Sequence, residues 1–377
     1  MDLGTGLQTV AEREEVLLAP YAMRSRDSLG RKHPQEEHPY RGPFQRDRDR
    51  IIHCSAFRRL SGKMQVFTGE HGDYHRTRLT HSHEVTSIAR TIGRALRLNE
   101  DLIEALALFH DIGHPPYGHS GEDALDDCLR DAGGFSHNRN AITIAEELEK
   151  RYPGFPGLNL TQEVLDSQAT RVDKQDQALK PLLEAQVVDV ADSATYDAHD
   201  TDDALKLGLV TLDELAENAL VREILDVVSR DLTNVSDHVR RTVLVRELVD
   251  RQVSNVLQFN GPRLQEANFT SATAARTSGF RIQVGSELAE KKLELERFLY
   301  ARVYRHPELI AVRNQAQDRI RRLFEHFTAH PDTLPDHIQR RIDSHGISRA
   351  AGEYIAGMTD RFCDNQYEQV CAGKTGG

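Results

Sequence analysis

The chain has 377 residues, and 48 lysines and arginines against 59 aspartates and glutamates give it a formal net charge of −11. Its 38% hydrophobic and 28% charged residues exclude intrinsic disorder, because such a composition provides enough apolar surface to bury. No window approaches the ~18 consecutive apolar residues of a membrane span, and the acidic balance disfavours a protein that coats nucleic acid through bulk charge.

The N-terminus lacks the basic, apolar and small-residue regions of a secretory signal. The four cysteines form no CxxC pair and no dense framework: Cys54, Cys128, Cys363 and Cys371. Free thiols fit a reducing compartment. We therefore expect a cytoplasmic protein without a membrane partner.

The apolar spacing predicts helices along most of the chain. A helix is expected at 10–26, followed by a polar connection. A second amphipathic helix contains Val85, Ala89 and Ile92 on one face, and a third starts near Asn99 and stops before Gly113. Further helices are expected at 181–200, 211–231, 236–258, 286–304, 307–328 and 348–370.

Loops and short strands complete the expected elements. Residues 152–161 and 260–280 have loop-like composition, whereas 63–66 and 281–284 have the pattern of short strands. The fold class is therefore all-α with at most a few short strands. We expect an N-terminal helix and arm over 1–50, a catalytic domain over 51–280 and a C-terminal helical region over 281–377, with one continuous domain as the alternative.

Histidines are concentrated in one part of the chain. Eight of the 18 lie within 67 consecutive residues, namely His71, His75, His81, His83, His110, His114, His119 and His137. Histidine is the commonest metal ligand and the side chain best suited to proton exchange near neutral pH. This cluster is the main indication of chemistry in the sequence.

The pair His110 and Asp111 lies at the expected end of a helix, where one metal ion can receive both side chains. Mixed nitrogen and oxygen ligands suit a borderline divalent ion. His81, 29 residues upstream, comes beside His110 if the two helices form a hairpin. Asp192 lies between apolar residues, so we expect it to be buried with a partner.

Asp192, Tyr196 and Asp200 follow one another at intervals of four residues, which places them on one helix face. A solvent-exposed face remains the alternative for Asp197 and Asp200. The motifs in this part of the chain, taken together, resemble a known family. They are RLTHSHEV (78–85), HDIGHPPYGHSGE (110–122) and EAQVVDVADSATYDAHDTDDA (184–204).

These motifs resemble the HD-domain phosphohydrolases, and more narrowly the dGTPase family of deoxynucleoside triphosphate triphosphohydrolases. YRGPFQRDRDRIIHCSAFRRLSGKMQVF (40–67) and YIAGMTDRFC (354–363) match the pattern of that family too. The resemblance implies an all-α HD-domain core with additional helices. It also implies hydrolysis at the α-phosphate of a deoxynucleoside triphosphate, dGTP among them, to the deoxynucleoside and inorganic triphosphate.

The resemblance assigns roles to individual residues. The metal ligands it implies are His81, His110, Asp111 and Asp192. Catalytic proton transfer and phosphate contacts are assigned to His114, His119, Glu122 and His137, with a purely structural histidine as the alternative for His114. Substrate binding is assigned to Arg59, Gln65, Arg78, Tyr196 and Asp200. His71, His75 and His83 receive no role, and Met64 stands where the family usually has threonine.

Positive charge is available where the triphosphate is expected. Residues 41–78 contain nine lysines and arginines and four acids, a local charge of +5. Arginine suits bidentate phosphate contact. The alternating RDRDR run at 46–50 has internal ion pairs as its alternative interpretation.

The resemblance implies one divalent ion per active site, Mg²⁺ or Mn²⁺, with Fe, Zn, Ni or Co also compatible. It also implies a homo-oligomer, tetramer or hexamer, in which a second dNTP can act as an allosteric ligand. Two alternative functions stay open. One is an HD phosphohydrolase acting on a monophosphate, a cyclic nucleotide or guanosine tetraphosphate. The other is a non-catalytic protein that binds nucleotides or single-stranded nucleic acid.

Overall fold

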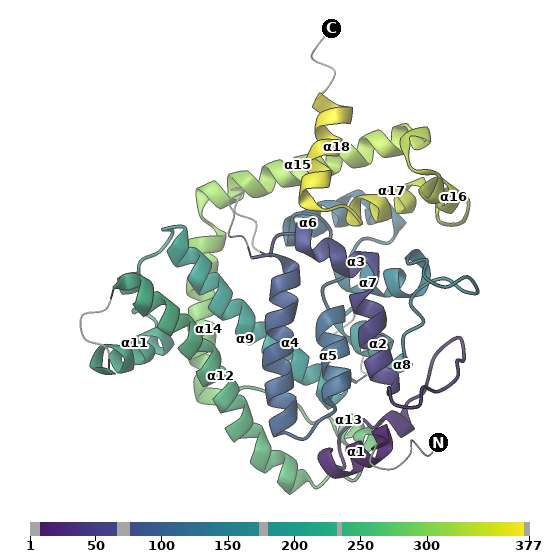
Figure 1. Cartoon of the computed structure of the whole chain (residues 1–377). Helices are drawn as coiled ribbons and strands as arrows, with labels where there is room; N and C mark the ends of the chain where they lie inside the picture. Colours follow the sequence, from purple (N-terminus) through teal and green to yellow (C-terminus); the bar gives the residue numbers. More distant parts are fainter. Residues whose placement is uncertain (1–7, 66–75, 173–179, 232–235, 373–377) are drawn as a thin grey trace.

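The computed structural model describes residues 8–65, 76–172, 180–231 and 236–372, without the side chains of 228–231 and 371–372. Within these ranges the chain is helical almost throughout (Figure 1). The same ranges contain only isolated β-bridges in place of strands, which confirms the all-α prediction. None of the described helices is long and apolar enough to cross a membrane.

The α-helices are α1 (Val10–Leu17), α2 (Pro43–Ile52), α3 (Ser55–Arg59), α4 (Arg78–Ala95), α5 (Glu100–Phe109), α6 (Gly118–Cys128), α7 (His137–Thr143), α8 (Gln162–Val172), α9 (Leu183–Lys206), α10 (Leu212–Leu215), α11 (Ala219–Asp231), α12 (Asp237–Ala267), α13 (Ala272–Ser278), α14 (Ser286–Leu299), α15 (Pro307–Ala329), α16 (Asp336–His345), α17 (Ile347–Ala356) and α18 (Asp360–Tyr367). Short 3₁₀ turns cover Ser25–Asp27, Leu60–Gly62, Arg130–Ala132 and Pro331–Thr333, and π turns cover Ile144–Leu148, Tyr300–Tyr304 and Glu368–Ala372.

Helices α4, α5 and α9 form the centre of the molecule. α4 packs against both α5 and α9, and α2 packs against α5 (Figure 1). The apolar face expected from the sequence is buried: Val85, Ala89 and Ile92 of α4 belong to the largest hydrophobic cluster. Burial of such a side chain stabilises the fold by ~1.5–3 kcal/mol. This packing brings three widely separated parts of the chain to one place.

Close approach between α4 and α5 depends on a glycine. A Cβ at Gly93 would lie 2.2 Å from Cδ1 of Ile103. α5 begins as predicted at Asn99, whose side-chain oxygen accepts a hydrogen bond from the Leu102 N–H over 3.2 Å. Such a cap satisfies one of the helix's unpaired donors. The hairpin that carries His81 toward His110 is therefore held tightly.

Two further hydrophobic clusters lie beside the central one. In the first, α15 crosses α6 and α17, and its Ile320, Leu323 and Phe327 are buried. In the second, α11, α12 and α14 pack around the C-terminal half of α9. The expected division of the chain near 50 and 280 stays a prediction.

Several boundaries predicted from the sequence are wrong. The first helix ends at Leu17 and does not continue to 26, and the segment 260–280, expected as a loop, is largely helical in α12 and α13. Gly261 and Pro262 suggested a break there. However, Val256 and Leu264 are buried in the central cluster on either side of the pair, and this packing outweighs the local cost of proline.

The other differences concern interruptions. The expected helix at 211–231 is divided into α10 and α11, and the one at 348–370 into α17 and α18. The helices not predicted outside 260–280 are α2, α3, α6, α7, α8 and α16. The expected strand at 63–66 is reduced to a bridge between Met64 and Thr77, and 281–284 forms no bridge. The backbone of the two expected strands hydrogen-bonds to side chains of neighbouring helices. The residue pattern of a single segment cannot reveal such contacts.

Candidate metal and phosphate site

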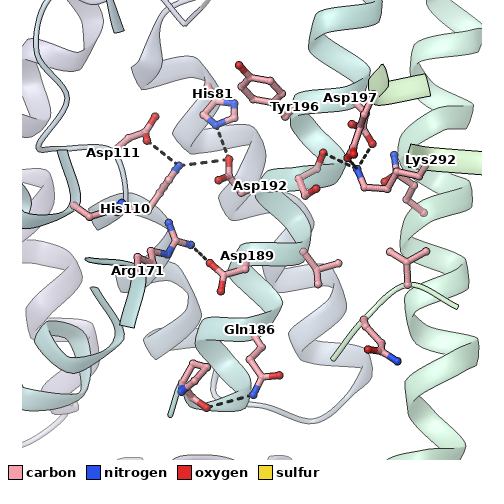
Figure 2. Close-up of a pocket in the computed structure, with 18 of the residues that line it drawn as sticks. His81, His110, Asp111, Arg171, Gln186, Asp189, Asp192, Tyr196, Asp197 and Lys292 are labelled. Carbon is pink, nitrogen blue, oxygen red and sulfur yellow. Dashed lines mark hydrogen bonds and ion pairs between the residues drawn. The ribbon is translucent and has the colours of Figure 1, made fainter. Parts of the chain in front are cut away.

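Four side chains from two helices and one turn converge at the centre of the molecule. His81 comes from the first turns of α4, Asp192 from α9, and His110 and Asp111 from the turn after α5. Figure 2 shows His81, His110 and Asp111 directed toward Asp192. Nε2 of His81 lies 2.9 Å from Oδ1 of Asp192, and Nε2 of His110 lies 3.7 Å from the same oxygen. The sequence grouped these four residues, and the structure brings them together.

The protonation of His110 shows what this cluster requires. Its Nδ1 donates to the carbonyl oxygen of Ala107 over 2.6 Å, so in the neutral ring Nε2 carries the lone pair. That lone pair faces Oδ1 of Asp111 at 3.3 Å, and it is buried without a hydrogen-bond partner among the described residues. Lone pairs that face one another repel unless a cation lies between them. The donor set therefore fits a metal ion.

The pKa shifts of these groups support the same interpretation. Burial lowers the pKa of His110, which keeps the ring in the neutral form that binds metals. Burial opposes ionisation of Asp111 and Asp192, but the neighbouring histidines, with Arg78 beside Asp111, hold both pKa values well below the usual range. His81, His110 and Asp192 also have donor atoms within 4.8 Å of one another. Two imidazoles with carboxylates suit a first-row divalent ion.

Arg78 lies directly behind this group. It is 2% exposed, and its Nη1 donates to Oδ2 of Asp111 over 2.9 Å. A Cβ at Gly118, which has a φ of +58°, would lie 2.7 Å from Nη2 of Arg78. Only glycine therefore allows the start of α6 to approach the guanidinium this closely. The arginine is fixed beside the cluster and available to an anion.

The other three histidines gather around a carboxylate. Oε1 of Glu122 accepts from Nδ1 of His137 over 2.7 Å, and Oε2 accepts from Nδ1 of His119 over 2.9 Å. The rings of His114 and His137 are stacked, with centroids 3.8 Å apart. Burial opposes ionisation of Glu122, yet its hydrogen bonds from His119 and His137 hold its pKa far below the usual range. Glu122 is thus an anion that orients two imidazoles.

His114 connects the two groups. Its Nε2 lies 3.2 Å from Oδ1 of Asp111, and burial, with Arg78 nearby, lowers its pKa well below the usual value. The four residues His114, His119, Glu122 and His137 have donor atoms within 4.8 Å of one another. The side chain of His119 is 60% exposed and His137 is 18% exposed, so this cluster forms the accessible side of the site.

A third group lies farther along α9. The hydroxyl of Tyr304 lies 2.7 Å from that of Tyr196 and donates to Asp200. Burial raises the pKa of Asp200 to about 8, so the carboxyl is protonated at neutral pH. The solvent-exposed alternative for Asp197 and Asp200 is wrong: both are buried, and Asp197 forms an ion pair with Lys292.

These groups line one cavity of about 1460 Å³. Gln65 also lines it, and its Oε1 is buried without a partner among the described residues. Cations that the sequence analysis did not single out line the same cavity: Arg171, Lys180, Arg281 and Lys292. Arg171 lies 2.5 Å from Asp189 (Figure 2). Tyr304 was missed too, and its only sequence signal is the four-residue spacing from Tyr300.

Arg59 and most of the positive segment 41–78, which were expected near the substrate, lie away from this cavity. Arg59 lines a separate cavity of about 510 Å³ between α3 and α17. Of the nine cations in the segment 41–78, Arg78 alone lines the cavity. Others form ion pairs, such as Arg41 with Asp49, Arg48 with Glu104 and Arg76 with Asp203, and the rest, such as Lys63, donate to neutral oxygens. Most of the local +5 is therefore not directed at the cavity, and ion pairing accounts for much of the RDRDR run.

Among the described residues, His83, Cys54, Cys128 and Cys363 do not line the cavity. His83 is exposed, and His71 and His75 lie outside the described residues. Cys54 and Cys363 are buried free thiols and Cys128 is a partly exposed one. The side chain of Cys371 lies outside the described part.

Comparison with known proteins gives matches over almost the whole chain. The model for the HD domain matches residues 78–197, and that for a phosphohydrolase-associated domain matches residues 282–369. A deoxyguanosinetriphosphate triphosphohydrolase-like protein of Geobacter metallireducens is 40% identical over 364 residues, which covers 94% of each chain. Proteins of the same name from Geobacter sulfurreducens and a Caulobacter species are 39% and 40% identical, covering 95% and 93% of this chain and 96% of each relative.

Proposed function

Because the chain belongs to the deoxyguanosinetriphosphate triphosphohydrolase-like family of HD-domain phosphohydrolases, we propose that it hydrolyses deoxynucleoside triphosphates, dGTP among them. The products would be the deoxynucleoside and inorganic triphosphate. Family membership confirms the resemblance indicated by the motifs. One observation carries the choice of substrate: the metal-binding cluster at Asp192 and the Tyr196, Asp200 and Tyr304 group line the same cavity.

The phosphate end of the substrate would lie at the metal cluster. His81, His110, Asp111 and Asp192 would hold a divalent ion, which when bound would supply Lewis-acid charge to polarise a phosphoryl oxygen and lower the pKa of water. Arg78 donates to a non-bridging oxygen of the α-phosphate from its position against Asp111. Because the guanidinium is buried and already oriented, little conformational entropy is lost when the phosphate binds.

Proton transfer would fall to the cluster around Glu122. Hydrolysis at the α-phosphorus breaks the bond to the 5′-oxygen, which must receive a proton as it leaves. An imidazole of His119 or His137 can donate that proton, and the anionic Glu122, bonded to both rings, stabilises the imidazolium form. His114, held neutral by burial, has Nε2 3.2 Å from Oδ1 of Asp111 and would lie beside the phosphate. A positioned acid of this kind contributes ~10²–10⁴ in rate.

The sugar would lie against the third group. The carboxyl of Asp200, which is protonated at neutral pH, can hydrogen-bond the 3′-hydroxyl. The ring of Tyr196 occupies space where a ribose 2′-hydroxyl would need room, and Gln65 offers an amide oxygen that no described residue bonds. Discrimination of deoxyribose from ribose follows from these contacts.

Mg²⁺ or Mn²⁺ is the ion we propose for turnover, and the two imidazoles also suit Fe, Zn, Ni or Co. The family also suggests a homo-oligomer, tetramer or hexamer, with a second dNTP as an allosteric ligand. The mass in solution, measured by light scattering with and without added dNTP, tests both points.

A substrate panel tests the proposed activity. The four dNTPs and GTP are incubated with Mg²⁺, Mn²⁺ or Co²⁺, and the products are separated by ion-exchange chromatography. Triphosphate release from dNTPs, with little from GTP, is expected. Turnover of a monophosphate, a cyclic nucleotide or guanosine tetraphosphate in place of dNTPs would indicate a different HD phosphohydrolase. Salt-sensitive oligonucleotide binding without any turnover would indicate a nucleic-acid-binding protein.

A further inference from the structure

The motif at 354–363 matches the family pattern, but none of its residues lines the catalytic cavity. Asp360, at the start of α18, is 3% exposed. Its Oδ2 accepts from the backbone N–H of Met64 over 2.9 Å, and its Oδ1 accepts from that of Tyr117 over 3.0 Å. One buried carboxylate therefore holds two backbone segments that are 53 residues apart in the sequence.

Both segments carry residues of the proposed site. Met64 precedes Gln65, whose amide oxygen has no partner within the part of the chain that the structure describes. Tyr117 precedes Gly118, the residue that lies against Arg78, and begins the helix that carries His119 and Glu122. The position of Asp360 thus determines where these substrate-facing groups lie.

Tyr117 shows that this contact is needed. Its φ is +61°, a left-handed conformation that is unfavourable for a residue with a Cβ. The Asp360 bond to its N–H, together with the bond from its hydroxyl to Asp364 over 2.6 Å, holds it in that conformation. In this conformation α6 begins at the next residue, Gly118, which lies against Arg78.

Lys63 makes the complementary contacts. Its side chain is buried, and Nζ donates to the carbonyl oxygens of His114 and Ala356 over 2.5 and 2.8 Å. Ala356 is the last residue of α17, and the carbonyl oxygen of Lys63 accepts from the N–H of Arg78 over 2.9 Å. The same lysine therefore connects the C-terminal helices to the start of α4 and to the turn after α5 that runs from His110 to His114, called the HD turn below.

We propose that Lys63 and Asp360 are positioning residues through which the C-terminal helices hold Gln65, Arg78 and the start of α6 in the geometry that binds the triphosphate. Neither residue touches substrate. This inference rests on the proposed function, because it assigns the C-terminal region a part in the same site.

Two variants remove these contacts with little change in volume. Asp360→Asn keeps one acceptor oxygen and turns an amide NH₂ toward a backbone donor, so one of the two bonds is lost. Lys63→Met keeps the apolar stem and removes both donated bonds. Asp47→Asn is the matched control, since Asp47 is also buried and accepts from the backbone N–H of Thr161, over 3.1 Å, but does not line the cavity.

The experiment measures binding of inorganic triphosphate by calorimetry in the presence of Mn²⁺, then the kcat and KM for dGTP, with Mn²⁺ affinity and the unfolding midpoint recorded for each variant. Asp360→Asn and Lys63→Met should each weaken triphosphate binding and raise KM about tenfold, while Mn²⁺ affinity changes less than about twofold. Asp47→Asn should lower the unfolding midpoint and leave triphosphate binding and KM within about twofold.

The positioning role is overturned if both variants bind triphosphate as tightly as the wild-type protein, or if Asp47→Asn weakens it equally. If Asp360→Asn does not fold, Lys63→Met alone decides the result. Failure of the proposed function has a different signature, because the wild-type protein would then release no triphosphate from any dNTP while the binding comparison still tests the positioning role.

Discussion

At the scale of single residues, the orientation of His110 is the most informative feature. The bond from Nδ1 to Ala107 fixes the tautomer, and the free Nε2 faces carboxylate oxygens of Asp111 and Asp192. The resemblance of the motifs to the dGTPase family implied these residues as metal ligands, a role that stays a prediction. The sequence could not predict Tyr304 or Lys292, because their roles arise from packing of α14 against α9.

The first prediction concerns the metal ligands. His110→Ala should abolish binding of Mn²⁺ and reduce dNTP turnover by about 10³-fold or more, because several kcal/mol of charge stabilisation is lost. Metal content after dialysis against Mn²⁺ and the initial rate with dGTP measure the two effects. His83→Ala is the control, since this exposed imidazole lies two residues from His81 and should leave both unchanged. Full activity in metal-free His110→Ala protein would contradict the assignment.

The second prediction concerns Asp200 and pH. Its pKa is raised by burial to about 8 in the folded protein, against ~3.9 in an unfolded chain. Between these values the folded state retains a proton that the unfolded state has lost, so the free energy of unfolding falls as pH rises. The loss is at most about 1.4 kcal/mol per pH unit. The contribution of Asp200 to stability is complete below the pKa of the unfolded chain and is lost above the pKa of the folded protein.

Asp200→Asn removes this titration. The stability of the variant relative to the wild-type protein should therefore increase steadily from about pH 5 to about pH 8. Urea unfolding at several pH values measures the difference. Stability curves that run parallel across this range would show that Asp200 titrates normally in the folded protein.

At the scale of helices, the sequence predicted the centres of most elements and missed many of their ends. The amphipathic faces of α4 and α5 are clear because each has a regular apolar stripe, and α5 also has a good start signal at Asn99. The continuation of α12 through Gly261 and Pro262 was missed, because burial of Leu264 against a distant helix decides it. The start of α6 after Tyr117 could not be predicted either, because the contact that holds Tyr117 comes from Asp360 of α18.

Glycines at helix contacts give the third prediction. A Cβ at Gly113, in the HD turn, would lie 2.0 Å from the carbonyl oxygen of His137 and 2.5 Å from the backbone nitrogen of Ala141. Gly113→Ala should therefore move α7 and destabilise the protein by about 1–3 kcal/mol. It should also reduce activity, because His137 moves with α7.

Gly261→Ala is the matched control for this substitution. Gly261 lies within α12 and has no atom within 4 Å of a new Cβ, so alanine should stabilise the protein by about 0.5–1 kcal/mol. Chemical unfolding measures both variants. Equal effects at the two positions would show that the contact between the HD turn and α7 is looser than described.

At the scale of the whole molecule, charge is arranged differently from the sequence estimate. The net charge of −11 hides a cavity whose lining includes Arg78, Arg171, Lys180, Arg281 and Lys292. The linear count over 41–78 placed the positive charge in one segment, but Arg78 is the one cation of that segment that lines the cavity. The other four cations of the cavity come from positions 171 to 292, a distribution that the folded structure reveals.

The central claim is hydrolysis at the α-phosphorus by a metal-dependent HD site. Hydrolysis of dGTP in water enriched in heavy oxygen, followed by mass spectrometry of both products, tests it most directly. The account predicts that one heavy oxygen enters the inorganic triphosphate, that the deoxyguanosine is unlabelled, and that His110→Ala yields neither product. Label in the deoxyguanosine, or release of dGMP and pyrophosphate, would contradict it.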